Sequence, residues 1–239
     1  RALPHSVRHV AIIGGGHNLR PGEISLSHSG VLFFDEIPEF SRMTLEALRQ
    51  PLEDRTISVA RAKETADYPA NFILIATANP CPCGYYGTET ECRCLPAQIV
   101  KYQQKISGPI LDRIDLFATV SQIDHKKLLA STGTAAADEN KIRNRIQTAR
   151  AAQAKRFKSN QKLNADMANR DIKQVASLSP AAKELIDTAA ARLNISARAY
   201  MRTIKVARTI ADLAGSPTIE PAHLTEARQY RSHSFQTVS

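Results

Sequence analysis

The sequence predicts an α/β fold in its first half and an all-helical domain in its second half. Two short apolar runs, one in SGVLFFDEIPEF (residues 29–40) and one in FILIATANP (residues 72–80), have the length and the polar boundaries of buried strands. From Lys141 onwards the apolar residues recur at helical spacing without a further strand pattern. We therefore predict an α/β domain over residues 1–125 and a helical domain over residues 126–239.

The remaining elements of the first half follow from local patterns. Residues 1–28 contain Gly-Gly-Gly and Pro-Gly sequences and predict loops. Apolar residues at helical spacing predict a helix over Phe40–Leu52, with Ser41 as its N-cap. Alternating apolar and polar residues predict a β-hairpin over Arg55–Tyr68, and Leu116–Val120 is predicted to be a third strand.

The net charge of +9 belongs to the second half of the chain. Residues 1–125 hold 12 Lys and Arg against 14 Asp and Glu, whereas residues 126–239 hold 20 against 9. This distribution favours a polyanionic partner such as DNA, and solvated helix faces are the alternative. No segment has the roughly 18 apolar residues of a membrane span, and the start of the chain lacks a signal-peptide pattern. We expect no membrane partner and a cytoplasmic location.

A basic segment follows a small, polar linker that is predicted over Ser131–Asn140. Lys141–Lys162 contains eight Lys and Arg and no acid, so at helical spacing it forms a strongly basic rod. Contacts with about six phosphates would make its binding to nucleic acid steeply dependent on salt. We take Lys155, Arg156 and Lys158 as candidate DNA contacts. Binding to the acidic half of a neighbouring subunit is the competing use.

All four cysteines lie in CPCGYYGTETECRC, as Cys81, Cys83, Cys92 and Cys94. Clustered cysteines in a chain without a signal peptide favour reduced thiols and a metal over a disulfide scaffold. Four thiolates can form the closed tetrahedral site of a structural Zn²⁺ ion. Reduced, metal-free thiols or a redox pair are the alternatives.

Candidate catalytic residues lie at the ends of the two predicted strands and beyond them. Asp35 and Glu36 follow the first strand, where paired acids can hold Mg²⁺ and activate water beside a nucleotide phosphate. Asn79 ends the second strand and either orients a water or caps a turn. Arg113, in LDRID, is a member of a local ion pair or an arginine finger. Arg198 lies on a predicted helix. It is either part of an ordinary basic amphipathic face or a residue of the functional site.

The order of these signals is more specific than any one of them. Six segments resemble, in this order, the magnesium-chelatase-like AAA+ ATPase family of the YifB/ComM type: RPGEISLSHSGVLFFDEIPEF, LEALRQPLEDRTISVARA, PANFILIATANPCPCGYYG, CRC, ISGPILDRIDL and SARAYMRTIKVARTIADL. The resemblance extends from about Arg1 to Arg231. It implies a partial AAA+ P-loop NTPase core, with helices on both faces of a sheet, followed by an all-α lid domain.

The resemblance also implies roles for single residues. Asp35 and Glu36 match the Walker B pair, in which Asp35 holds Mg²⁺ through water and Glu36 polarises the attacking water. Asn79 matches the residue called sensor 1. Arg113 matches the arginine finger, and Arg198 matches the sensor 2 arginine that binds a phosphate of ATP.

The predicted hairpin resembles the pre-sensor-1 hairpin, which related ring helicases point into their central channel. Arg61 and Lys63 are then candidate DNA contacts that bind phosphates and do not read bases. Simple packing of the hairpin on the sheet is the alternative.

The chain departs from the family in one respect. The phosphate-binding loop needs G-x-x-x-x-G-K-[ST], and none of the ten glycines in this chain is followed by Lys. In the family this loop lies upstream of the segment that matches Arg1, so we expect the chain to be the C-terminal portion of a longer protein and inactive in isolation. We also expect an incomplete sheet whose exposed strand edges favour self-association.

For the whole protein the resemblance implies a Mg²⁺-dependent ATPase that assembles into a ring, expected to be a hexamer of identical subunits. Its work is DNA remodelling, such as helicase or branch-migration activity in recombination or DNA uptake. The cofactors expected are ATP, Mg²⁺ and a structural Zn²⁺. One alternative is a chelatase ATPase that drives Mg²⁺ insertion into a porphyrin. Another is a DNA-binding or assembly module without ATPase activity.

Overall fold

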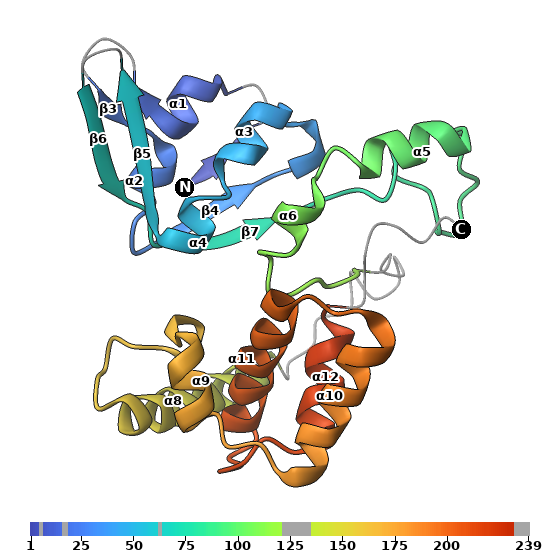
Figure 1. Ribbon diagram of the computed structural model, residues 1–239. Helices are drawn as coiled ribbons and strands as arrows, with labels where there is room; N and C mark the ends of the chain where they lie inside the picture. Colours follow the sequence, from blue (N-terminus) through green and yellow to red (C-terminus); the bar gives the residue numbers. More distant parts are fainter. Residues whose placement is uncertain (5–6, 16–18, 62–63, 121–134, 232–239) are drawn as a thin grey trace. The chain divides into compact units, whose positions relative to one another are not determined.

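The computed structural model describes residues 1–4, 7–15, 19–61, 64–120 and 135–231 (Figure 1). The chain divides into two units, Arg1–Ile114 and a second one that begins at Asp115. The first unit combines helices with a parallel sheet, and the second unit is helical. The predicted order of an α/β half and a helical half is therefore confirmed.

The centre of the first unit is a parallel sheet in the order β1 (Ala2–Leu3), β4 (Val31–Phe34) and β7 (Ile73–Ala76). Both strands that the apolar runs predicted are present, but the expected burial is confirmed only for β4; β7 is mostly exposed because it lies at the edge of the described sheet. The last residues of β4 and β7 lie opposite each other, so both strands end at the same edge of the sheet. Leu32 and Phe34 are fully buried in the hydrophobic core, which is why this strand is so apolar.

The segment before β4 contains short elements where the sequence predicted only loops. α1 (His9–Ile13) and α2 (Glu23–Leu26) flank a short antiparallel pairing of β2 (Gly14–Gly15) with β3 (Arg20–Pro21). A Cβ added at Gly22 would lie 2.3 Å from a backbone nitrogen of β2, so glycine is needed for this close approach. The glycines and prolines of this segment therefore do not exclude short elements, and some of them form part of β2 and β3.

The predicted helix over Phe40–Leu52 is divided into α3 (Arg42–Ala47) and α4 (Pro51–Asp54). Ser41 is the N-cap, as predicted, and its hydroxyl accepts a backbone hydrogen bond at 3.2 Å. Pro51 explains the division, because it has no amide hydrogen with which to continue α3 and is favoured at the first position of a new helix.

The predicted hairpin is confirmed as the antiparallel pair β5 (Thr56–Arg61) and β6 (Glu64–Pro69). Its alternation is the expected one, because Ile57 and Val59 are buried while Ser58 between them is exposed. Figure 1 shows the hairpin at one side of the unit, beside α2 and β3. The inner face of the hairpin thus packs on the unit, as the packing alternative requires.

The chain after β7 carries α5 (Pro96–Gln103) and α6 (Gly108–Leu111), but the predicted third strand over Leu116–Val120 does not form. A strand needs a hydrogen-bonded neighbour. Instead, Phe117 donates its backbone N–H to the carbonyl of Tyr230 at 2.7 Å. This prediction was wrong because an apolar run of strand length does not by itself supply that neighbour.

The outer edge of β7 is open in the described part of the sheet. There β7 pairs with β4 alone, and Ile73 and Ile75 are 64% and 48% exposed. An exposed strand edge was predicted and is confirmed for these residues, whereas the self-association expected from it stays a prediction.

Among the described residues, the second unit is made of helical elements. They are α8 (Ala135–Phe157), the 3₁₀ turn η2 (Asn164–Asp166), α9 (Asn169–Val175), α10 (Pro180–Leu193), α11 (Ala197–Leu213) and α12 (Pro221–Gln229). α11 lies between α8 and α9 on one side and α12 and α10 on the other (Figure 1). Across the described residues, no helix combines the length and the apolar character needed to cross a membrane.

The start of α8 corrects the linker predicted over Ser131–Asn140. The helix begins at Ala135, inside that segment. Alanines have the highest helix propensity, and an acid in the first turn such as Asp138 is favoured by the helix dipole. Small and polar residues predicted a linker, but these residue types also start a helix.

A buried charge network holds α8, η2 and α11 together. Asp212 is 3% exposed and accepts hydrogen bonds from Arg156 at 2.5 and 2.8 Å and from Asn164 at 2.8 Å. Arg208, which is fully buried, bonds to the same carboxylate at 3.0 Å. Burial raises the pKa of Asp212, but the bonds from Arg156 and Asn164 and the charge of Arg208 outweigh it, so the pKa lies below its ordinary value.

Asp212→Asn should destabilise the helical unit by about 3 kcal/mol, because it removes the charge that compensates two largely buried guanidinium groups. The stabilisation by ionised Asp212 should be complete above the unfolded pKa near 3.8 and should be lost as the pH falls through the lower folded pKa. Urea unfolding at neutral and acidic pH measures both effects. Glu184→Gln, at an exposed position of α10, is the control and should leave the unfolding midpoint unchanged. Equal midpoints for the two variants would contradict the prediction.

Candidate functional site

The ends of β4 and β7 bring together three of the predicted site residues. Asp35 and Glu36 follow β4 directly, and Asn79 lies shortly after β7. The side-chain amide of Asn79 donates a hydrogen bond to Oε1 of Glu36 at 3.2 Å. In open sheets with parallel strands, ligands bind beyond the carboxyl ends of the strands. The structure thus gathers two carboxylates and an amide where a ligand is expected.

Thr77 connects the two acids, although the sequence analysis did not single it out. Its hydroxyl donates to Oδ1 of Asp35 at 2.7 Å and accepts the backbone N–H of Glu36 at 2.9 Å. Its own backbone N–H donates to the carbonyl of Phe34 at 3.0 Å, and its carbonyl accepts the N–H of Ile37 at 2.9 Å. One residue of β7's end therefore holds the whole turn that follows β4.

A signal for Thr77 was present in the sequence. In FILIATANP it is the first hydroxyl residue after the apolar run, at the same strand end as Asn79. A polar side chain at the end of a parallel strand marks the edge of the sheet where ligands bind. Its partner atoms, however, lie on a different strand, so the sequence alone does not identify the bond.

Glu36 has a backbone conformation that side-chain-bearing residues rarely adopt. Its φ of 52° and ψ of 57° lie in the left-handed region. A residue held there costs roughly 1–3 kcal/mol, and such residues cluster at functional sites. The hydrogen bonds from Thr77 and Asn79 hold Glu36 in this conformation.

The donor atoms at this site fit a hard divalent cation. Carboxylate and hydroxyl oxygens are the ligands that Mg²⁺ prefers, usually together with retained waters. Asp35 is exposed and uses Oδ1 for the bond with Thr77, which leaves its other oxygen for a hydrated ion. The amide of Asn79 beside the carboxylate of Glu36 fits the orientation of a water molecule.

Arg113 is held within the first unit. Its guanidinium forms an ion pair with Glu53 of α4 and donates to the carbonyl of Pro109 at 2.7 Å, and its side chain is nine-tenths buried. Arg113 is therefore paired with a carboxylate that is distant in sequence. Asp115, two residues further along the chain, bonds instead to Arg202 at 2.6 Å.

Arg198 belongs to the helical unit. It is exposed in the first turn of α11, where Ser196 is the N-cap and accepts a backbone hydrogen bond at 3.2 Å. Its predicted contact with a phosphate of ATP stays a prediction.

The four cysteines form one compact cluster. The Sγ atoms of Cys81, Cys83 and Cys92 lie 3.4, 3.7 and 3.6 Å apart, and all four sulfurs, including that of Cys94, lie within 4.8 Å of one another. In a tetrahedral site with Zn–S distances of about 2.3 Å, neighbouring sulfurs are about 3.8 Å apart. All four thiols are free, so the cluster fits a four-thiolate metal site.

The turn between the first two cysteines explains how the tight Cys-x-Cys spacing works. The N–H of Gly84 donates to the carbonyl of Cys81 at 3.0 Å, and Gly84 has a φ of 83°, which glycine adopts without strain. The N–H of Tyr86 donates to Sγ of Cys81 at 3.3 Å. The backbone thus folds around the sulfur, as it does around a thiolate.

The cysteine thiols differ in acidity. A backbone hydrogen bond from Tyr85 lowers the pKa of Cys83 to about 6, whereas burial raises the pKa of Cys94 to about 12. Metal ligands are thiolates, so metal binding at this cluster releases protons.

Of the two DNA contacts predicted on the hairpin, Arg61 and Lys63, only the backbone of Arg61 is described. Arg61 is the last residue of β5, and its backbone pairs with Glu64 of β6. Lys63 lies outside the described residues. The hairpin that would present both residues is therefore formed, and their contact with DNA stays a prediction.

The predicted contacts on the basic rod separate into two kinds. Lys155 is exposed on α8 and Lys158 is exposed just after its end. The guanidinium of Arg156 instead bonds to Asp212 and Asn164 inside the helical unit. Because those bonds occupy its donors and hold its side chain at 15% exposure, Arg156 is removed from the candidate DNA surface.

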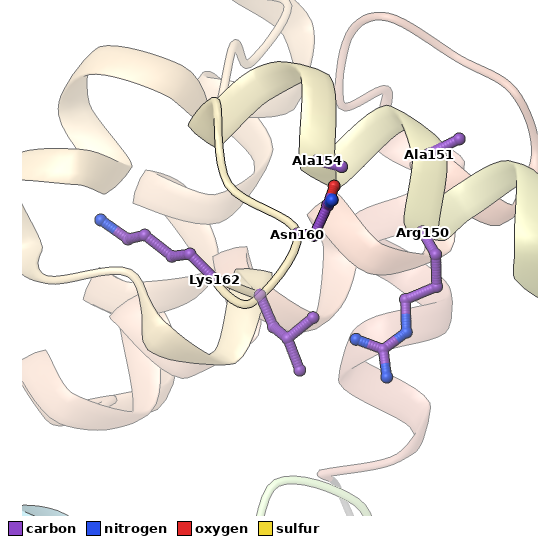
Figure 2. A pocket seen from close by; sticks show the side chains of 6 residues that line it. Arg150, Ala151, Ala154, Asn160 and Lys162 are labelled. Carbon is purple, nitrogen blue, oxygen red and sulfur yellow. The ribbon is translucent and has the colours of Figure 1, made fainter.

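A hollow of about 350 Å³ lies beside α8, and Figure 2 shows side chains that line it. Its two cationic residues, Arg150 and Lys162, point their charged ends apart. Lys162 also bonds to Asp171 at 2.7 Å, which lowers the pKa of that carboxyl. The two cations therefore do not converge on one anion in this hollow.

Comparisons with known proteins agree with the resemblance. Residues 1–128 match the family model described as magnesium chelatase, subunit ChlI, and residues 136–231 match its C-terminal model. Competence protein ComM of Haemophilus influenzae is 41% identical over 232 residues, and the uncharacterized protein YifB of Escherichia coli is 40% identical over the same length. Each alignment covers 97% of this chain and 45% of the relative. The chain therefore spans about half the length of these curated relatives.

A more distant relative is a DNA replication protein. The DNA replication licensing factor mcm6 of Dictyostelium discoideum is 29% identical over 106 residues, which cover 44% of this chain and 11% of that protein.

The two family models together span most of the chain, including the acids at the end of β4 and the cysteine cluster. The chain belongs to the magnesium-chelatase-like family of the YifB/ComM type.

Proposed function

We propose that this chain is part of an AAA+ ring motor that hydrolyses ATP and acts on DNA. The observation that carries the proposal is the hydrogen-bonded group of Asp35, Thr77, Glu36 and Asn79 at the ends of two adjacent parallel strands. Two acids and a polar sensor at this edge are what phosphoryl transfer to water needs, namely a cation site and a positioned nucleophile.

The roles follow from the contacts. Asp35 binds hydrated Mg²⁺ through the oxygen that Thr77 leaves available. Glu36 accepts a proton from the attacking water, and Asn79 orients that water through the same carboxylate. A Mg²⁺ ion held by Asp35 would supply positive charge that stabilises the negative charge of the ATP phosphates. The phosphate-binding loop is the part of the site that this chain does not contain.

Assembly into a homo-oligomeric ring, most simply a hexamer, completes the site in this proposal. Arg113 acts on the nucleotide of a neighbouring subunit and must then exchange its bond with Glu53 for a phosphate. Arg198 contributes a second cation from the exposed start of α11. The open edge of β7 also favours association with another polypeptide segment.

DNA is the proposed substrate for two reasons. The helical half carries the excess of Lys and Arg, with Lys155 and Lys158 exposed. Among the relatives, one is named a competence protein and another a DNA replication licensing factor. We propose helicase or branch-migration work on this basis, with Arg61 and Lys63 of the hairpin as phosphate contacts.

The second candidate is a chelatase motor that drives Mg²⁺ insertion into a porphyrin. The description of the family model, a magnesium chelatase subunit, favours it. The cysteine cluster and the identity to ComM over nearly the whole chain favour the first candidate. A third candidate, a DNA-binding or assembly module without hydrolysis, applies to the chain in the absence of a phosphate-binding loop.

We further propose that the cysteine cluster binds a structural Zn²⁺ ion. The sulfur–sulfur distances support it, and four thiolates complete a closed site with no position for substrate. Four reduced cysteines and the use of ATP both fit a cytoplasmic protein.

Glu36→Gln should abolish ATP hydrolysis that is stimulated by DNA, because an amide cannot accept the proton of the attacking water. The assay uses the chain extended upstream to include a phosphate-binding loop and measures phosphate release with and without branched or single-stranded DNA. Glu91→Gln, in the exposed part of the cysteine loop, is the matched control and should retain activity. A hydrolysis rate that DNA does not change but that depends on a porphyrin-binding partner would support the chelatase alternative and overturn the first proposal.

Thr77→Val should lower kcat by roughly 10- to 100-fold with a smaller change in KM, because it keeps the shape of the side chain but removes the hydroxyl that positions Asp35 and Glu36. Thr77→Ser restores the hydroxyl and should recover most of the activity. Steady-state ATPase kinetics of the same extended protein measure both variants. If Thr77→Val kept wild-type kcat, the positioning role would be wrong.

Protein purified without chelator should contain one zinc ion per chain by elemental analysis, because four thiolates supply one complete tetrahedral site. Cys83→Ser together with Cys92→Ser should remove the bound zinc. Protein without zinc under these conditions would contradict the assignment.

A further inference from the structure

The cysteine loop begins at the candidate site and is attached to the strand end that carries Asn79. Pro80 follows Asn79 directly, and Cys81, the next residue, is fully buried. Gln103, at the end of α5, donates its side-chain amide to the carbonyl of Pro80 at 3.0 Å. α5 itself starts just after the last cysteine, Cys94. The loop and α5 therefore form one arm that returns to the backbone beside Asn79.

The same arm contacts the segment that follows Glu36. Lys105 bonds to the carboxylate of Glu39 in η1 (Ile37–Glu39) at 3.4 Å. Tyr102 of α5 is 5% exposed, and burial followed by the negative charges of Glu39, Glu36 and Cys81 raises its pKa to about 12. Gln103 at the end of α5 therefore bonds next to Asn79, and Lys105 just after α5 bonds in the segment that follows Glu36, so the arm has a contact on each side of the Glu36–Asn79 bond.

The main hydrophobic core does not include the cysteine loop, whereas α5 buries two apolar side chains apart from that core. Among the described residues, the main core cluster of the unit has no member from Cys81 to Lys105 and resumes at Ile106. Residues Gly87–Glu91, in the middle of the loop, are all exposed. Ile99 and Tyr102 are buried outside the core cluster. The cysteine cluster is therefore the main fixed point of the loop from which α5 begins.

We propose that Zn²⁺ bound by the four cysteines is the positioning element that keeps Asn79 at Glu36, with α5 as the connection. Zinc gives the four sulfurs a common centre, and the ordered loop aims α5 so that Gln103 and Lys105 reach Pro80 and Glu39. Without zinc the arm loses this centre, and the strand end that carries Asn79 loses its support. The consequence for hydrolysis rests on the proposed ATPase function, whereas the consequence for the strand end rests only on the proposed zinc binding at the cysteine cluster.

Hydrogen–deuterium exchange tests the structural part in this chain itself. Protein loaded with Zn²⁺ is compared with protein stripped by a chelator and with stripped protein reloaded with Zn²⁺. Removal should reduce the protection of the backbone amides of Thr77, Ile37 and Glu39, which donate to the carbonyls of Phe34, Thr77 and Glu36, and reloading should restore it. The amides of α11, in the helical unit, are the internal reference and should not change. Equal protection at the strand end with and without zinc would overturn the proposal.

Kinetics test the functional part in the protein extended upstream to include a phosphate-binding loop. Gln103→Ala removes the contact with Pro80 but leaves all four thiols, so zinc content should stay at one per chain while kcat falls by roughly tenfold or more. Affinity for a nucleotide analogue should be unchanged, because the residues that bind phosphate are not altered. Glu91→Gln, within the loop but outside the cluster, should retain both zinc and kcat. An unchanged kcat in Gln103→Ala would overturn the connection through α5.

The two proposals fail in different ways. If Glu36→Gln hydrolysed ATP normally, the proposed function would be wrong, while zinc-dependent protection at Thr77 and Ile37 would still support the positioning role. If Glu36→Gln were inactive but zinc-stripped protein kept wild-type kcat and unchanged protection, the proposed function would stand and the zinc inference would be wrong.

Discussion

The candidate site depends on the hydroxyl of Thr77. It donates to one acid through the side chain and accepts from the other through the backbone, so a single group sets the distance and direction of Asp35 and Glu36. Glu36 occupies a strained left-handed conformation that needs such support from a neighbouring strand. The parallel register of β4 and β7 makes this contact available, because it places the two strand ends at the same level.

A second constraint arises from the small size of the core. The apolar residues of β4, β7, α3 and the hairpin form one cluster that stops short of the loop after Asn79. A chain segment that buries little apolar surface lacks the usual driving force for order. In our proposal a metal bound by the cysteine cluster substitutes for that surface, and because the cluster begins two residues after Asn79, metal binding and site geometry become parts of one arrangement.

Charge in the helical unit has both surface and internal roles. Arg156 and Arg208 share the buried carboxylate of Asp212, which secures α8 against α11. Lys155 and Lys158 flank Arg156 in sequence and face solvent. The count of basic residues therefore overstates the surface available to a polyanion, and the candidate DNA surface consists of the exposed members only.

The sequence by itself determined the two principal strands, the hairpin, the helical second half and the choice of Asp35, Glu36, Asn79 and the four cysteines. These follow from short-range patterns, namely apolar runs, alternation and residue spacing, which local chemistry specifies. Only the tertiary structure decided the contacts of Thr77, Glu53, Arg156 and Gln103, and the absence of a strand at Leu116–Val120. Each of these depends on a partner far away in the sequence, and hydrogen bonds between distant residues are set by packing and register, which no local pattern records.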